Sequence, residues 1–189
     1  MMFGKQSLMN ESKTACGPTA AVDSEFATDV ESSRSVTGYV ITIAGGAVSW
    51  RSKMQSTVAT SSCHAEYVAA SELSRELMWC RYLLTEIGME MSLPSIVYED
   101  NTAAKIMTSN VGVTDRSKHI RVKVHYVREC VTEGAIALSQ IRSADNPADA
   151  LTKASKIESI NALKKAAGIV DAEEAPASGR VKHDREASA

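Results

Sequence analysis

The stretch from residue 60 to residue 87 carries the longest helical pattern in this sequence. Its apolar residues recur at spacings of three and four, which places them on one face of a long amphipathic helix. The residues that form this face are Ala69, Ala70, Leu73, Leu77, Cys80, Leu84 and Ile87. Ser61 and Ser62 suit the N-terminal cap, and Gly88 stands where a helix ends. We expect the rest of the chain to be organised around this helix.

The same helical face carries Glu66 one turn earlier. A carboxylate on the buried side of a helix needs a physical reason, because burial disfavours its charge. One interpretation is a glutamate at the rim of the core that reaches water. The other is that Glu66 faces a metal ion held jointly with acids from neighbouring strands. The helical pattern by itself leaves both interpretations open.

The composition describes an ordinary soluble domain with one core: 189 residues, 44% hydrophobic and 23% charged. No apolar run approaches the roughly 20 residues that cross a bilayer, and the start of the chain lacks a hydrophobic signal segment. We therefore expect an intracellular, cytoplasmic protein without a membrane, or one inside a virus-like particle or the nucleus. The four cysteines form no C-x-x-C pair, which argues against a zinc site or a disulfide framework.

The first half of the chain predicts three strands. Residues 18–26 are mildly apolar, and residues 34–43 are rich in β-branched and aromatic side chains. A Gly-Gly pair at 45 and 46 separates that stretch from residues 47–50, which predicts a β-hairpin. The polar residues 51–57 are expected to link this hairpin to the long helix.

The second half predicts strands that alternate with helices. Residues 95–100, SIVYED, form an apolar run that ends in two acids, as a buried strand would that delivers acids at its end. The following stretches predict a short helix at 101–107, a loop at 109–115, an amphipathic helix at 118–131 and a strand at 135–141. Lys118, Arg121, His125 and Arg128 share one face of that second amphipathic helix and give it a basic side.

A last helix is predicted after Asn146, which suits an N-cap, and Pro147, which suits the first helical position. This helix would run to about Ala167, with Asp149 in its first turn. Its later buried face would carry Ile157, Ile160 and Leu163.

The order of predicted elements is typical of an α/β fold with a mixed sheet flanked by helices. We assign residues 1–17 to a flexible arm, 18–168 to the folded domain and 169–189 to a disordered tail, because the tail contains few large apolar residues.

Four acids fall on four different predicted elements: Asp23, Glu66, Asp100 and Asp149. Each has a plain structural explanation, such as a turn, a helix cap or an interaction with a helix dipole. If they converged, two carboxylates about 4 Å apart would repel by about 4 kcal/mol at an effective dielectric near 20. They would stay ionised together only if cations lay between them, and oxygen ligands favour Mg²⁺ or Mn²⁺ over zinc.

Several segments resemble the ribonuclease H domain at the end of copia-type (Pseudoviridae) retrotransposon polyproteins. They include DSEFATD, AEYVAASE, VYEDN, DRSKHI, HYVRE and NPADALTK, in the order of that family. The resemblance implies the ribonuclease H-like fold, a five-stranded mixed sheet with three antiparallel strands followed by parallel βα units, flanked by helices. It also implies that Asp23, Glu66, Asp100 and Asp149 are the metal-binding and catalytic carboxylates.

The activity that the resemblance implies is hydrolysis of the RNA strand of RNA–DNA hybrids, with two Mg²⁺ (or Mn²⁺) ions as cofactors. Its usual partner is a reverse transcriptase domain in the same polyprotein, but this chain has no Y-x-D-D segment, so it is expected to be a polyprotein fragment or a genomic remnant. The alternative is a catalytically inactive domain that binds nucleic acid or a protein. An exonuclease or integrase-type nuclease would need different motifs around the acids.

We also assign a set of hybrid-binding residues from their positions around the four acids. Side chains near Glu66 and Asp100 are expected to approach the wide minor groove, where the 2′-hydroxyl marks RNA. Residues on the basic helix are expected to contact phosphates without reading sequence. The set consists of Gln55, Ser61, Ser62, Asn101, Lys118, His119 and Arg121.

Overall fold

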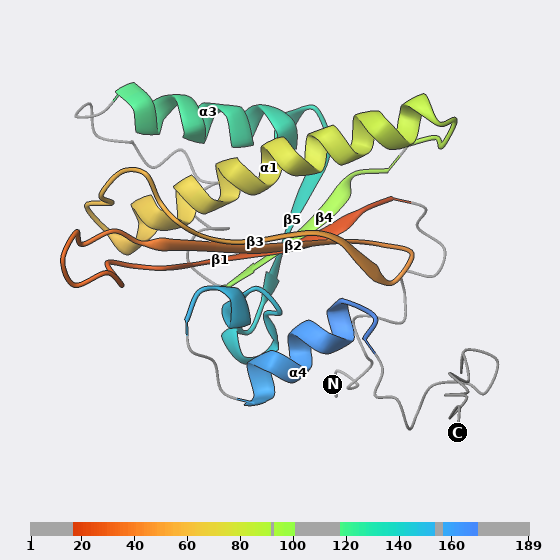
Figure 1. The fold of residues 1–189 in the computed structure, drawn as a ribbon. Helices are drawn as coiled ribbons and strands as arrows, with labels where there is room; N and C mark the ends of the chain where they lie inside the picture. The colour runs from red at the N-terminus through yellow and green to blue at the C-terminus, as the bar shows by residue number, and fades with distance from the viewer. Residues whose placement is uncertain (1–16, 92, 101–117, 154–156, 170–189) are drawn as a thin grey trace, which may run out of the picture.

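The computed structural model describes residues 17–91, 93–100, 118–153 and 157–169. These residues form a five-stranded sheet in the order β3-β2-β1-β4-β5. Helices α1 (Ser62–Glu86) and α3 (Lys118–Thr132) cover one face of the sheet, and α4 (Ile157–Ala166) covers the other (Figure 1). The predicted arm and tail lie almost entirely outside the described residues, and so do the predicted short helix and loop between 101 and 115.

The three N-terminal strands form the antiparallel part of the sheet: β1 (Thr19–Glu25), β2 (Val36–Ile43) and β3 (Gly46–Met54). The predicted hairpin is confirmed. Its turn places Ala44 and Gly45 at positive φ, which matches the right-handed twist of the flanking strands. Strand β3 is longer than predicted, because it continues past Trp50 to Met54 through residues that we assigned to a polar link. An edge strand of this kind needs main-chain pairing with one neighbour and does not need an apolar sequence.

Helix α1 is confirmed at both predicted ends. Ser61 is its N-cap, and the Ser61 hydroxyl accepts a hydrogen bond of 3.1 Å from the backbone N–H of His64. Gly88 follows the last turn with a φ of 87°, a conformation that glycine adopts without a steric cost. The predicted apolar face is largely buried, and Leu73 and Leu77 are fully enclosed.

The C-terminal strands β4 (Ser95–Asp100) and β5 (Ile136–Ile141) are parallel to each other, and β4 is also parallel to β1. Helix α3 precedes β5 and packs against α1, with Val124 and Val127 buried as predicted. The C-terminal ends of β1 and β4 therefore lie at the same end of the sheet, which places acids from two strands at one edge.

The predicted last helix is wrong in its first half. Asp149 lies in a separate 3₁₀ turn, η3 (Asp149–Leu151), which follows a similar turn, η2 (Ser143–Asp145). Asn146 holds the chain between the two turns, because its amide Nδ2 donates to the Val22 carbonyl at 2.9 Å and its Oδ1 accepts from the Ala148 N–H at 3.0 Å. A side chain tied to β1 in this way anchors a turn and does not begin an α-helix.

The predicted buried face of the last helix is also only partly correct. Ile157 is 64% exposed and Ile160 is exposed as well, whereas Leu163 packs against the cluster formed by Ala21, Val40 and Ala148. Helix α4 therefore covers only part of its face of the sheet. None of the helices in the described residues is long and apolar enough to cross a membrane.

Alternation along β1 decides which side chains point to which layer. Ala20 and Val22 belong to the main core under α1, with Leu73 and Leu77, whereas Ala21 belongs to the smaller core on the α4 side. Because side chains of a strand alternate between faces, Asp23 lies on the α4 side. The first acid of the predicted set thus approaches the site from the face opposite to Glu66.

Candidate active site

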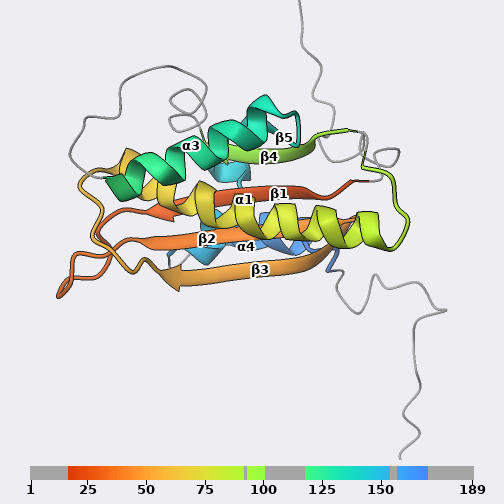
Figure 2. The ribbon, with the colours of Figure 1, turned by 90° about the horizontal axis from the view of Figure 1, so that it is seen from above.

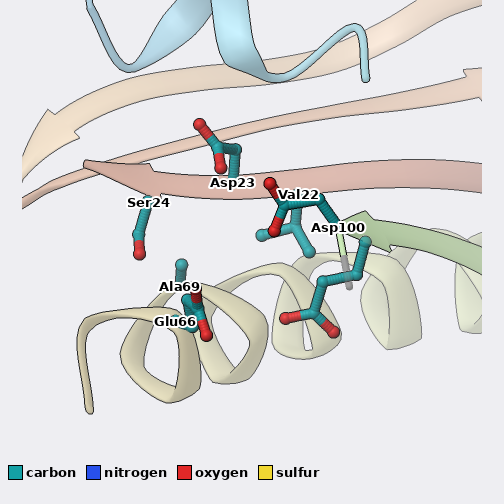
Figure 3. A pocket seen from close by; sticks show the side chains of 7 residues that line it. Val22, Asp23, Ser24, Glu66, Ala69 and Asp100 are labelled. Carbon is teal, nitrogen blue, oxygen red and sulfur yellow. The ribbon is translucent and has the colours of Figure 1, made fainter. Parts of the chain in front are cut away.

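Asp23 and Asp100 stand next to each other at the ends of two neighbouring parallel strands. Ala21 of β1 pairs with Tyr98 of β4, so two residues further along each strand Asp23 and Asp100 reach the same level. Figure 3 shows their side chains at the end of the sheet, with the Asp23 carboxylate on the side of β1 away from α1. The topology of the sheet thus joins two acids that are 77 positions apart in the sequence.

Each of these two acids accepts a hydrogen bond from a hydroxyl group near the C-terminal turns. Thr152 Oγ1 donates to Asp23 Oδ2 at 2.7 Å, and Ser143 Oγ donates to Asp100 Oδ2 at 2.5 Å. Burial nevertheless raises the pKa of Asp23; the Thr152 hydrogen bond opposes that rise, and repulsion from Asp100 and Asp149 adds to it. Asp23 therefore carries an electrostatic strain that a nearby cation would relieve.

Glu66 reaches the same pocket from the first turns of α1 on the other face of the sheet. The pocket is lined by Val22, Asp23, Ser24, Glu66, Ala69, Glu99 and Asp100. Burial raises the pKa of Glu66 to about 7, and repulsion from Asp100 and Asp23 adds to this effect. Its Oε2 atom is buried and has no hydrogen-bond partner among the described residues. This geometry disfavours the interpretation of Glu66 as a rim residue that reaches water.

Glu99 is the fourth acid of this pocket, with Asp23, Glu66 and Asp100, and the sequence analysis did not assign it to the site. It is 3% exposed, and burial together with repulsion from Glu66 holds the pKa of its carboxyl well above the usual range. The sequence signal that could have identified Glu99 is the pair of acids at the end of the SIVYED run. The strand alternation sends them to opposite sides, so that Glu99 points into the α1 layer and Asp100 stands at the strand end.

Asp149 lies on the α4 side of the site and is already neutralised by other residues. Its Oδ2 accepts from the Ser159 hydroxyl at 2.7 Å, and its Oδ1 forms an ion pair of 2.5 Å with Lys153 Nζ. Asp149 is close enough to Asp23 to contribute to the pKa of that residue. Sequence analysis missed Lys153 and Ser159, because neither role produces a local pattern.

The four predicted acids therefore gather at one end of the sheet, from both of its faces. They do not form a closed ligand set: within the part of the chain that the structure describes, no group of three or more His, Cys, Asp or Glu side chains is placed to hold a metal ion. The chemistry of the donors still fits a divalent cation. The pocket offers oxygen donors only, four carboxylates and the Ser24 hydroxyl, and the Oε2 atoms of Glu66 and Glu99 are buried without a hydrogen-bond partner among the described residues. The raised pKa values of Asp23 and Glu66 indicate uncompensated negative charge.

The pKa of Glu66 predicts a dependence of stability on pH in the absence of divalent ions. The folded protein holds this proton up to about pH 7, whereas the unfolded chain releases it near 4.5, so the free energy of unfolding should fall as pH rises through this window. Glu66→Gln should flatten that decline and stabilise the protein at pH 8 by about 1 kcal/mol, a value reduced for partial solvation. Urea titrations in EDTA between pH 4.5 and 8 measure the free energy of unfolding at each pH. If the variant loses stability with rising pH as steeply as the wild type, the prediction is wrong.

The predicted hybrid-binding residues have different outcomes. Gln55 is 2% exposed, and its Nε2 donates to Thr37 Oγ1 at 3.0 Å and to the Ala65 carbonyl at 2.9 Å, so its assignment to a surface contact is wrong. Gln55 instead connects the end of β3 to the start of α1 through its hydrogen bond to the Ala65 carbonyl. Ser61 and Ser62 are exposed at the beginning of α1, and Arg121 is exposed on α3. Asn101 and the side chains of Lys118 and His119 lie outside the described residues.

Comparison with known proteins agrees with this architecture. No protein-family model matches the sequence. Among solved structures, the LC11-RNase H1 isolated from compost superposes with a TM-score of 0.55 at 18% identity, over 72% of this chain and 93% of that one. The fold, with its acids at the ends of β1 and β4, is therefore that of the ribonuclease H-like proteins, as predicted.

Sequence relatives define the family more closely. The chain is 40% identical over 131 residues to the retrovirus-related Pol polyprotein from transposon TNT 1-94 of Nicotiana tabacum. It is 37% identical, over the same length, to the polyprotein from transposon RE2 of Arabidopsis thaliana. These matches cover 69% of this chain and about a tenth of each relative. The chain is a homologue of one segment of retrovirus-related Pol polyproteins, which confirms the resemblance seen in its motifs.

Proposed function

We propose that this domain is a ribonuclease H that hydrolyses the RNA strand of RNA–DNA hybrids in a reaction that depends on Mg²⁺. The observation that carries the proposal is that Asp23 and Asp100, at the ends of neighbouring strands of a ribonuclease H-like sheet, line one pocket with the unpartnered buried oxygen of Glu66. The homology to Pol polyproteins supports the same activity, because the motifs of this chain resemble the ribonuclease H domain of such polyproteins. A reverse transcriptase domain of the same polyprotein is the proposed partner.

The chain's own residues prepare the site for a cation and a phosphate. Asp23 and Asp100 would hold a divalent ion, with Glu66 from α1 and Asp149 from η3 as further ligands. Bound there, Mg²⁺ would supply a Lewis acid that activates water and offsets the charge of the phosphate. Thr152 and Ser143 fix the two central carboxylates through their hydroxyl groups. The ion pair with Lys153 neutralises the charge of Asp149 in the absence of a metal ion.

Recognition of the hybrid is proposed for the exposed residues beside this site. Ser61 and Ser62 stand at the start of α1, one turn before Glu66, and their hydroxyl groups suit hydrogen bonds in a minor groove lined with 2′-hydroxyls. Arg121, exposed on α3, suits a phosphate contact without base specificity. With a net charge of −2, the whole chain depends on such local contacts for binding.

Cleavage of a hybrid with a labelled RNA strand tests the proposal. The full chain with Mg²⁺ should shorten the RNA to products with 5′-phosphate and 3′-hydroxyl ends, and EDTA should stop the reaction. A DNA duplex of the same sequence serves as the matched control and should stay intact. Intact RNA in the presence of Mg²⁺, with the hybrid still bound, would favour the alternative of a binding module. The ion pair between Asp149 and Lys153 is the observation that favours this alternative, because it already neutralises one of the four acids.

A further inference from the structure

The outer face of α1 carries a row of four exposed residues that the proposed active site does not use. Arg75, Trp79, Tyr82 and Glu86 follow one another at spacings of four, three and four, so they form one stripe along the helix. Trp79 is 58% exposed and Tyr82 is 65% exposed. This spacing is the one that lets two helices pack side by side at a small angle.

The stripe lies opposite the face that builds the core. Leu73 and Leu77 of the same helix are fully buried under the sheet side of α1. Leu83 is also exposed and adds apolar surface beside the stripe, whereas Ile87, predicted for the buried face, is the exposed C-cap residue. In the view from above, α3 lies beside α1, and the C-terminal turns of α1 extend beyond the end of α3 (Figure 2). Single exposed apolar residues are common, but a contiguous group at helical spacing marks a contact surface.

We propose that this stripe pairs with the same stripe of a second copy of the chain, with the two α1 helices antiparallel. The charge pattern of the stripe favours a second copy of the chain as the partner. The midpoint between Arg75 and Glu86 is also the midpoint between Trp79 and Tyr82, so a two-fold axis there places each arginine opposite the partner's glutamate. The same axis places each Trp79 ring beside the partner's Tyr82 ring. Parallel pairing would instead bring like charges together, which is unfavourable.

The charged ends of the stripe are available for such pairing. The ion pairs that the structure gives among the described residues involve neither Arg75 nor Glu86, and both side chains are exposed. The paired rings supply the apolar centre of the contact, since tryptophan, tyrosine and arginine carry much of the binding energy in protein interfaces.

The geometry predicts a weak dimer with two separate sites. About three turns of helix bury less surface than a permanent interface, so we expect dissociation in the range of about 0.1–1 mM. Glu66 lies near the N-terminal end of α1, before the stripe. With a rise of about 1.5 Å per residue, antiparallel pairing places the two Glu66 positions roughly 40 Å apart along the helices. Both candidate sites therefore stay open in the dimer.

Sedimentation equilibrium of the full chain over a concentration series tests this proposal. The wild type should dimerise, and Arg75→Glu or Glu86→Arg alone should weaken the dimer by about tenfold or more, because each reversal creates two repulsive pairs. The double variant Arg75→Glu/Glu86→Arg should restore the wild-type affinity to within about threefold. Lys165→Glu and Glu158→Arg, exposed on α4, make the same charge changes on the opposite layer and should have no effect.

The charge swap distinguishes self-pairing from the other occupants of this surface. A protein that stays monomeric at about 1 mM, the upper end of the expected range, overturns the proposal, because about half of the chains would be dimeric at that concentration even with the weakest affinity expected. So does a dimer that the single reversals leave unchanged, since its interface lies elsewhere. Failure of the double variant to recover, with circular dichroism showing intact folding, would also reject the antiparallel register. The result does not depend on whether the domain cleaves RNA.

Discussion

Asp100→Asn should reduce cleavage of the RNA strand by at least about a hundredfold while the protein stays folded and still binds the hybrid. Asp100 is the last residue of β4 and stands at the level of Asp23, so its carboxylate lies between the acids of the two faces. An amide at this position keeps the shape of the side chain but loses the negative charge that attracts a divalent ion. The Ser143 hydroxyl that now donates to Asp100 can donate equally well to an amide oxygen.

The control for this prediction is Asp145→Asn, which makes the same chemical change a short distance away. Asp145 is exposed on η2, where it pairs with Arg142 at 2.6 Å. Exposed ion pairs contribute little, so this variant should keep nearly full activity. Initial rates with a labelled hybrid, together with binding measured in Ca²⁺ or EDTA, give the comparison. Equal loss in both variants, or full activity of Asp100→Asn, would remove Asp100 from the site.

The second large effect is expected at Gly38, which makes room for the turn that carries Asp149. Gly38 pairs with Asp23 across β1 and β2. A Cβ atom at this position would stand 2.7 Å from Thr152 Cγ2 and 2.9 Å from the Ala148 carbonyl oxygen. Gly38→Val should therefore lower the free energy of unfolding by about 3 kcal/mol, the upper part of the range for overpacking. Displacement of Thr152 and Asp149 should reduce activity as well.

Gly17→Val is the matched control, because a Cβ atom at Gly17 would meet no atom of the described residues within 4 Å. Chemical unfolding curves of the two variants measure the difference in stability. Cleavage rates at a temperature where both are folded measure the effect on the site. If Gly38→Val were as stable and as active as the control, the close approach of η3 to β2 would have no role in placing Asp149.

Much of the fold was predictable from local patterns. The helical spacing after Ser61, the Gly-Gly pair between two β-rich runs and the apolar run before Asp100 each predicted an element that the structure contains, although the hairpin turn is Ala44–Gly45 and Gly46 already belongs to β3. The errors occur where a long-range contact overrides the local signal. Polar residues up to Met54 continue β3 because β2 offers a partner, and Asn146 anchors a turn because its side chain reaches Val22.

The candidate site was less accessible to sequence reasoning. Spacing along the chain did not show that Asp23, Glu66, Asp100 and Asp149 meet; the resemblance to ribonuclease H motifs supplied that expectation. The structure brings the four acids to one end of the sheet but divides them between its two faces. It also adds Glu99, Thr152 and Lys153, whose roles depend on contacts that no local pattern records.

The sequence by itself determined the elements and the residue types that could do chemistry, because periodicity, capping and turn preferences act over a few residues. Tertiary structure alone decided which acids became neighbours, which hydroxyl groups hold them and that Gln55 is buried in the core. Strand order, register and side-chain alternation set these relations, and each of them depends on pairing between segments far apart in the chain.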